Sequence, residues 1–80
     1  MIFYTYILYS ASKDKYYIGH TADLILRLSQ HNSTQNLGAN DWKIHYSETF
    51  DTRAEAMRRE KEIKNKKSRK YIEWLIHQND

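Results

Sequence analysis

The spacing of apolar residues predicts two neighbouring strands at the N-terminus. Residues Ile2–Tyr9 are nearly all apolar, as in a strand that is covered on both faces. A polar turn, Ser10–Asp14, separates them from a second run, Lys15–Gly19, so the two runs are expected to form a β-hairpin. Gly19 is expected to end the second strand, and Thr21 to cap a following helix. The first strand should therefore lie at the centre of a sheet.

A helix is predicted over Ala22–Asn32. Leu24 and Leu28 are four residues apart and should face the core, with Ile25 beside them. The segment Asn32–Asp41 that follows is a polar loop.

Strict alternation predicts a third strand, Trp42–Phe50, with one buried face. The residues expected on that face are Trp42, Ile44, Tyr46 and Phe50.

Two helices are predicted in the last thirty residues. Thr52–Glu55 has the pattern of a capping box, and an inward stripe follows it, formed by Ala56, Met57, Ile63 and the stem of Lys64. Residues 65–67 are expected to break the helix, and Ser68 to cap a last one with an apolar stripe and Trp74 packed at its edge. The sequence thus predicts one α+β domain over residues 1–80, a three-stranded antiparallel sheet flanked by helices in the order β-β-α-β-α-α.

The positive charge is concentrated in the C-terminal part of the chain. Residues 51–80 carry nine Lys/Arg against six Asp/Glu, whereas residues 1–50 carry four of each, so the whole net charge of +3 lies after residue 50. A basic helical surface favours a polyanion, most simply nucleic acid, and the competing interpretation is a solvated helix face. The residues expected to contact nucleic acid are His20, Lys61, Lys64, Lys66, Lys67, Arg69 and Lys70.

Two polar features stand out from the apolar pattern. Asp23, Arg27 and His31 are four residues apart and form one stripe, which is either an exposed ion-pair ladder or one wall of a cleft. Glu60 falls on the inward stripe of its helix, where a carboxylate is costly unless it is paired or bound to a metal. A buried ion pair, for example with Arg27, is the structural alternative to a metal site.

The motifs Tyr4-Thr5-Tyr6 and Tyr17-Ile18-Gly19, together with Arg27 and Glu60, resemble the GIY-YIG nuclease domain family, in particular its small stand-alone bacterial, UPF0213-like branch. The resemblance covers nearly the whole chain. In the first motif Tyr4-Thr5 replaces Gly-Ile, and the late asparagine of the family has no clear counterpart, because Asn65 lies too close to Glu60.

The resemblance implies a role for each of five residues. Tyr6 would be the general base or a water-orienting phenol, and Tyr17 would support the nucleophile and the phosphate. Arg27 would stabilise the transition state, His31 would assist proton transfer, and Glu60 would hold one Mg²⁺ or Mn²⁺ ion. These types of group suit phosphodiester hydrolysis, since a guanidinium matches phosphate oxygens and a hard cation prefers oxygen ligands.

Two hypotheses for the function follow, and a third is weaker. The first is a metal-dependent endonuclease that acts on DNA, with RNA not excluded, in repair or recombination. The second is a nucleic-acid-binding module on the same scaffold with little or no cleavage. The third is a subunit-interaction domain that uses the surfaces of Trp42 and Trp74.

Composition and chain length bear on the cellular location of the protein. The chain has no cysteine, and its N-terminal apolar run is too short to span a membrane and lacks the positive start of a signal peptide. We therefore expect a cytoplasmic protein with no membrane partner, monomeric or weakly dimeric.

Overall fold

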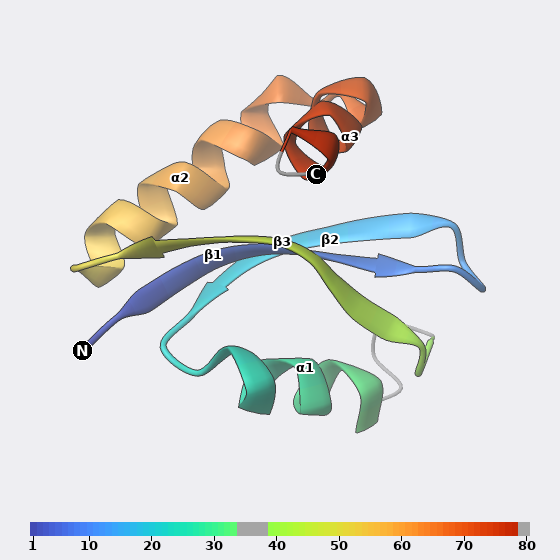
Figure 1. Cartoon of the computed structure of the whole chain (residues 1–80), viewed down its shortest axis with the longest axis horizontal. Coiled ribbons are helices and arrows are strands. Elements are labelled where there is room, and N and C mark those ends of the chain that lie inside the picture. Colours follow the sequence, from blue (N-terminus) through green and yellow to red (C-terminus); the bar gives the residue numbers. More distant parts are fainter. Residues whose placement is uncertain (34–38, 79–80) are drawn as a thin grey trace.

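The structure is a computed structural model that describes residues 1–33 and 39–78. The elements follow one another as β1 (Phe3–Ser10), β2 (Lys15–Thr21), α1 (Leu24–Ser33), β3 (Trp42–Phe50), α2 (Arg53–Lys66) and α3 (Arg69–His77). The strands form one antiparallel sheet in the order β2-β1-β3, so the nearly continuous apolar run lies at its centre, as predicted. Helix α1 covers one face of the sheet, and α2 and α3 cover the other (Figure 1).

Each face of the sheet has its own core. On the α1 face the buried residues are Tyr6, Leu8 and Trp42, and both predicted leucines of α1 pack against them. On the opposite face the buried residues are Ile7, Ile63 and Leu75. Because successive residues of β1 point to opposite faces, this one strand supplies both cores, which explains its nearly continuous apolar character.

Strand β3 does not present a single buried face. Trp42 and Ile44 belong to the core under α1, whereas Tyr46 packs into the core under α2 and α3. The register explains the change, because Ile7 pairs with Tyr46 but Leu8 pairs with Ile44, which leaves His45 as an extra residue. Such a β-bulge reverses the side-chain alternation from that point on. The prediction of one shared face was therefore wrong, although the strand itself is confirmed.

Several element boundaries differ from the prediction. Strand β2 continues past Gly19 to Thr21, and α1 is capped by Asp23, whose Oδ1 accepts a hydrogen bond from the backbone N–H of Leu26 at 3.0 Å. Thr21 instead bonds to the backbone of Asp23. Helix α2 runs on to Lys66, so the expected break is confined to Lys67, which caps the helix in the left-handed conformation.

The two predicted caps of the last helices are confirmed. Thr52 Oγ1 accepts a hydrogen bond from the backbone N–H of Glu55 at 3.2 Å, and Ser68 Oγ accepts one from that of Tyr71 at 3.2 Å.

Three apolar side chains expected on or next to a buried stripe are exposed. Ile25 is 72% exposed, Met57 50% and Trp74 57%. Each lies one position away from a stripe that is buried, and a helix turns about 100° per residue, which carries the neighbouring side chain away from the core. Among the described residues, no helix is long and apolar enough to cross a membrane.

Candidate active site

The two motif tyrosines meet His31 on the α1 face of the sheet. The hairpin register pairs Tyr6 with Gly19 and Leu8 with Tyr17, which places the two phenols on the same face. Tyr6 Oη lies 3.2 Å from His31 Nε2, and the rings of Tyr17 and His31 pack with their centroids 4.6 Å apart. His31 is buried because α1 turns it toward the sheet, on the same side as Leu28. The structure thus brings together three of the five residues expected at the site.

Gly19 is the position that allows Tyr6 to lie across the edge strand. A Cβ atom added at Gly19 would lie 2.5 Å from the hydroxyl oxygen of Tyr6 and 2.7 Å from its Cζ atom. Contacts this short are not compatible with the observed position of the Tyr6 ring. Glycine is therefore required because the ring lies where a Cβ atom would be, and not because of its backbone angles.

Burial shifts the protonation of this cluster toward neutral forms. Burial, followed by the influence of Tyr17, raises the pKa of Tyr6 to about 12. Burial and the positive charge of Arg27 both hold the pKa of His31 below 6.5. At neutral pH the cluster therefore contains a protonated phenol and a neutral imidazole, which is able to accept a proton.

Glu60 lies on the other face of the sheet, where α2 packs against β2. Its Oε1 is 2.6 Å from His20 Nδ1 and its Oε2 is 2.6 Å from Lys64 Nζ. The side chain is 18% exposed, so it is held between the helix and the strand without being sealed from solvent.

The partners of Glu60 keep its carboxyl group ionised. Burial opposes ionisation, but hydrogen bonds from Lys64 and His20 outweigh it, so the pKa of Glu60 lies below its usual value. Because an ionised carboxylate can only accept, His20 donates its Nδ1–H to Glu60. The structural alternative, an ion pair of Glu60, is present in this structure, but its partner is Lys64 on the same helix and not Arg27.

Arg27 and Glu60 do not contact the tyrosine cluster directly, but their charges shift pKa values within it. Arg27 is exposed on α1, and its charge lowers the pKa of both Tyr6 and His31. The charge of Glu60 raises the pKa of Tyr6, although the two residues lie on opposite faces of the sheet. Since β2 is an edge strand, the two halves of the expected site meet around that edge, near Gly19 and His20.

A hollow of about 590 Å³ opens beside Glu60. It is lined by the carboxylate of Glu60, two apolar side chains and several basic groups: His20, Ala54, Met57, Arg58, Lys61 and Lys64. The hollow gives an ion or an anionic strand access to Glu60 from solvent. Tyr6 and Tyr17 are not among its lining residues, so the residues expected at the site do not line one common hollow.

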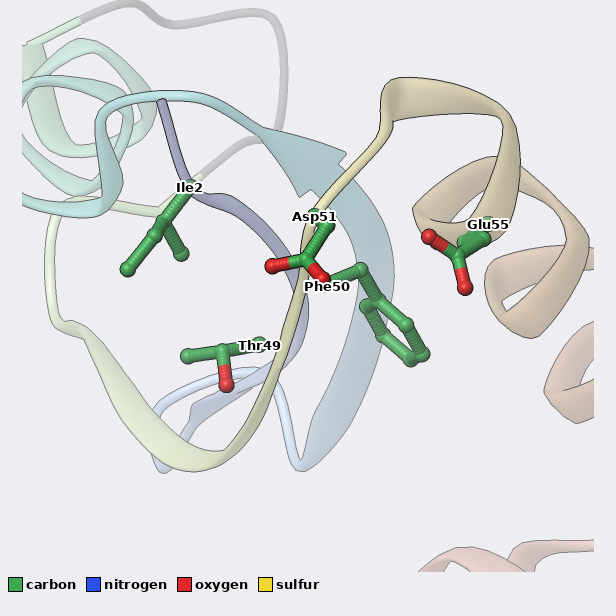
Figure 2. A pocket seen from close by; sticks show the side chains of 5 residues that line it. All are labelled: Ile2, Thr49, Phe50, Asp51 and Glu55. Atoms are coloured by element: carbon green, nitrogen blue, oxygen red, sulfur yellow. The ribbon is translucent and has the colours of Figure 1, made fainter.

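A second, smaller hollow of about 180 Å³ lies where β3 passes into α2 (Figure 2). Ile2, Thr49, Phe50, Asp51 and Glu55 line it, and none of them was expected at the site. The Glu55 carboxylate is already engaged there, because its Oε1 accepts a hydrogen bond from the helix cap Thr52 at 3.0 Å. The carboxylate of Glu55 therefore has a local structural role.

Some of the basic residues expected to contact nucleic acid form ion pairs with carboxylates of the chain, and others do not. His20 and Lys64 bind Glu60, and Arg69 bridges Asp14 and Glu73. Within residues 1–33 and 39–78, the lysines at 61, 66, 67 and 70 make no ion pair. The available positive charge therefore lies on the exposed side of α2 and on the turn into α3.

The contacts of His20 and Lys64 with Glu60 were not predicted from the sequence, which indicated nucleic acid as the partner of both residues. The spacing of Glu60 and Lys64, four residues apart on a helix, was a usable signal. Alternation along β2 was another, since it places His20 on the face opposite to Tyr17.

Comparison with known proteins identifies the family of this chain. The family model described as the GIY-YIG catalytic domain matches residues 2–72, which include both tyrosine motifs, Arg27, His31 and Glu60. The chain belongs to the GIY-YIG family. Members of this family are generally endonucleases that use a divalent metal ion.

Two relatives place the chain within the GIY-YIG family. It is 37% identical over 57 residues to a UPF0213 protein of Halobacterium salinarum, an alignment that covers 66% of this chain and 74% of the relative. It is also similar to the solution structure of the UPF0213 protein BH0048 from Bacillus halodurans, with a TM-score of 0.62 and 31% identity over 96% of this chain and 84% of the other. The fold and the UPF0213-like branch of the family are thereby confirmed.

Proposed function

We propose that this GIY-YIG protein is a divalent-metal-dependent endonuclease that hydrolyses phosphodiester bonds in DNA, in repair or recombination. The observation that supports this most is the state of Glu60. It is a partly buried, ionised carboxylate that opens onto a hollow with basic walls. A carboxylate in such a position suits a cation that is shared with a phosphate group.

Glu60 offers one carboxylate to a Mg²⁺ or Mn²⁺ ion that keeps several waters, and the ion would share or replace the contacts of its two oxygens with His20 and Lys64. Among the described residues, no group of three or more His, Cys, Asp or Glu side chains is arranged to hold a metal ion. Glu60 would thus be the protein ligand, with water and substrate oxygens as the others, a common arrangement for Mg²⁺. When bound, the ion would supply positive charge for the leaving oxygen.

We assign proton transfer to Tyr6 and His31 acting together. Tyr6 keeps its proton at neutral pH, so it does not act as a preformed phenolate. Its hydroxyl oxygen can take a proton from the attacking water while its own proton passes to His31 Nε2, 3.2 Å away. This relay uses the tautomer of His31 with Nδ1 protonated. Tyr6 is 2% exposed, and we place the attacking water beside the half-buried Tyr17.

Arg27 and Tyr17 complete the proposed chemistry. The exposed guanidinium of Arg27 can bind two phosphate oxygens at once. A lysine at position 27 would present a point charge without the second hydrogen bond. Tyr17 packs on His31 and would hold the water and the phosphate against the Tyr6–His31 pair.

The proposal is tested with a panel of branched, nicked, single-stranded and duplex DNA, and with RNA, each in Mg²⁺, in Mn²⁺ and with chelator. We expect metal-dependent cleavage of DNA by the wild type. Glu60→Gln should lower the rate by roughly 100-fold or more, since a catalytic metal contributes several kcal/mol. Circular dichroism should show an unchanged fold. Binding without cleavage on every substrate would favour the binding-module alternative.

A further inference from the structure

Trp74 of α3 exposes a large aromatic surface. Its side chain is 57% exposed, whereas the other tryptophan, Trp42, is 5% exposed in the core. Trp74 also lies beyond residues 2–72, the part of the chain that the GIY-YIG model matches. Because exposing an indole to water is unfavourable, such a side chain points to an interaction surface when its neighbours support one.

The Trp74 ring is held in a fixed position. It stacks on Tyr71, with centroids 5.8 Å apart and an angle of 28° between the planes. The Tyr71 hydroxyl accepts a hydrogen bond from Arg59 at 3.5 Å, and Arg59 also donates to Glu48 on β3 at 2.8 Å. This chain of contacts connects the aromatic pair to the sheet, so little conformational entropy would be lost when a ligand stacks on it.

Two lysines accompany the aromatic pair. Lys66 Nζ lies over the Tyr71 ring, 5.3 Å from its centroid, and Lys70 precedes Trp74 by one helical turn. Residues 61–70 contain six Lys/Arg and one Glu. Neither Lys66 nor Lys70 is neutralised by an ion pair within the described parts of the chain. An aromatic surface among unpaired cations is complementary to a polyanion with flat rings, which is a nucleic acid strand.

We propose that Trp74 and Tyr71, with Lys66 and Lys70, form a stacking platform for an unpaired base of a nucleic acid strand. Single-stranded binding combines cationic contacts to the backbone with bases stacked on aromatic side chains, and paired bases in a duplex cannot stack in this way. The proposal rests on the proposed function in that the ligand is nucleic acid. It extends that function by naming the substrate class, a strand with an unpaired region.

The platform and the proposed metal ligand face different edges of the sheet. Glu60 contacts His20 on β2, whereas Tyr71 is connected through Arg59 to Glu48 on β3, at the other edge. The part of the strand that binds the platform thus lies away from the phosphate that reacts near Glu60. We therefore infer that the platform selects the unpaired region that flanks the cleaved bond, and that it takes no part in the chemistry.

The test measures binding without cleavage, in protein that carries Glu60→Gln. Fluorescence anisotropy of a labelled oligothymidylate, or of a labelled blunt duplex of equal length, is measured at a series of salt concentrations, and the Trp emission is recorded at one of them. We expect the emission of the exposed Trp74 to be quenched by the single strand. Trp74→Ala should weaken single-strand binding by about tenfold with an unchanged salt slope. Lys70→Gln should reduce that slope by about 0.7.

Matched control variants show whether a loss of affinity comes from the aromatic face of Trp74. Trp74→Phe should retain most of the affinity, because it retains an aromatic face. Leu26→Ala, at an equally exposed apolar side chain on α1, should change nothing. Sedimentation velocity of the same proteins shows whether a second copy of the chain covers Trp74 instead.

Three outcomes would overturn the platform: equal loss of single-strand and duplex affinity in Trp74→Ala, no loss of either, or a dimer that Trp74→Ala dissociates. All three are independent of cleavage. A failure of the platform is thus distinguishable from a failure of the proposed nuclease activity, which is measured on the wild type.

Discussion

At the scale of single residues, the site depends on a few close approaches. Tyr6 lies across Gly19 and bonds to His31, and Glu60 is held by His20 and Lys64. The motif spacing and the hairpin predicted that the two tyrosines meet. The sequence could not show that Tyr6 crosses the edge strand, because this depends on a ring orientation that only packing determines.

Gly19→Ala should destabilise the protein by roughly 1–3 kcal/mol, the usual cost of forcing an extra carbon into a packed position. The cause is the 2.5 Å approach of the new Cβ to the Tyr6 hydroxyl. The measurement is a double-mutant cycle with Tyr6→Ala, followed by chemical denaturation. In the Tyr6→Ala background the penalty should largely disappear, and an undiminished penalty would show that Tyr6 is not its cause.

His31 should make the folded state less stable in mild acid. Its folded pKa lies below the unfolded value of 6.5, so the unfolded chain takes up the proton first as the pH falls. The contribution of His31 is therefore complete above pH 6.5, and the free energy of unfolding decreases as the pH falls below that value. His31→Gln should flatten this part of the stability profile between pH 5 and 8, and the exposed control His45→Gln should not. The same slope in wild type and His31→Gln would contradict the assignment.

At the scale of elements, periodicity predicted every helix and strand, but not every face. The apolar and polar spacing located β1, β2 and α1, and the two capping patterns located the starts of α2 and α3. The β3 bulge was not predicted, because the apolar residues Trp42, Ile44 and Tyr46 alternate regularly in the sequence. The extra residue is visible only in the register against β1. It matters because it turns Glu48 toward Arg59 and so supports the Tyr71–Trp74 pair.

Deleting His45 should unfold the protein or lower its melting temperature severely. Without the extra residue, either Trp42 and Ile44 or Tyr46 and Glu48 would have to point to the wrong face of the sheet. Thermal denaturation followed by circular dichroism provides the measurement. His45→Ala is the matched control, since it keeps the number of residues and should be nearly neutral at this exposed position. A stable deletion variant would show that the bulge is dispensable.

At the scale of the whole molecule, the sheet separates the expected site into two groups. Tyr6 and Tyr17 meet His31 where α1 packs on the sheet, and Glu60 projects from α2 on the opposite face. The charge of Glu60 acts on Tyr6 around the edge strand β2. The family resemblance named five residues for the site without any structure, and their roles stay a prediction. It could not predict this division, because motif spacing carries no information on which face of the sheet a later helix covers.

The central claim is that Glu60 holds the divalent ion, and paramagnetic broadening by Mn²⁺ tests it most directly. In ¹⁵N-labelled protein, substoichiometric Mn²⁺ should first broaden the amide signals of Glu60, His20 and their neighbours. Glu60→Gln should abolish this pattern, while Glu62→Gln, at an exposed carboxylate of the same helix, should leave it intact. Broadening that survives Glu60→Gln, or that is centred on Asp51 and Glu55 in the hollow of Figure 2, would contradict this claim.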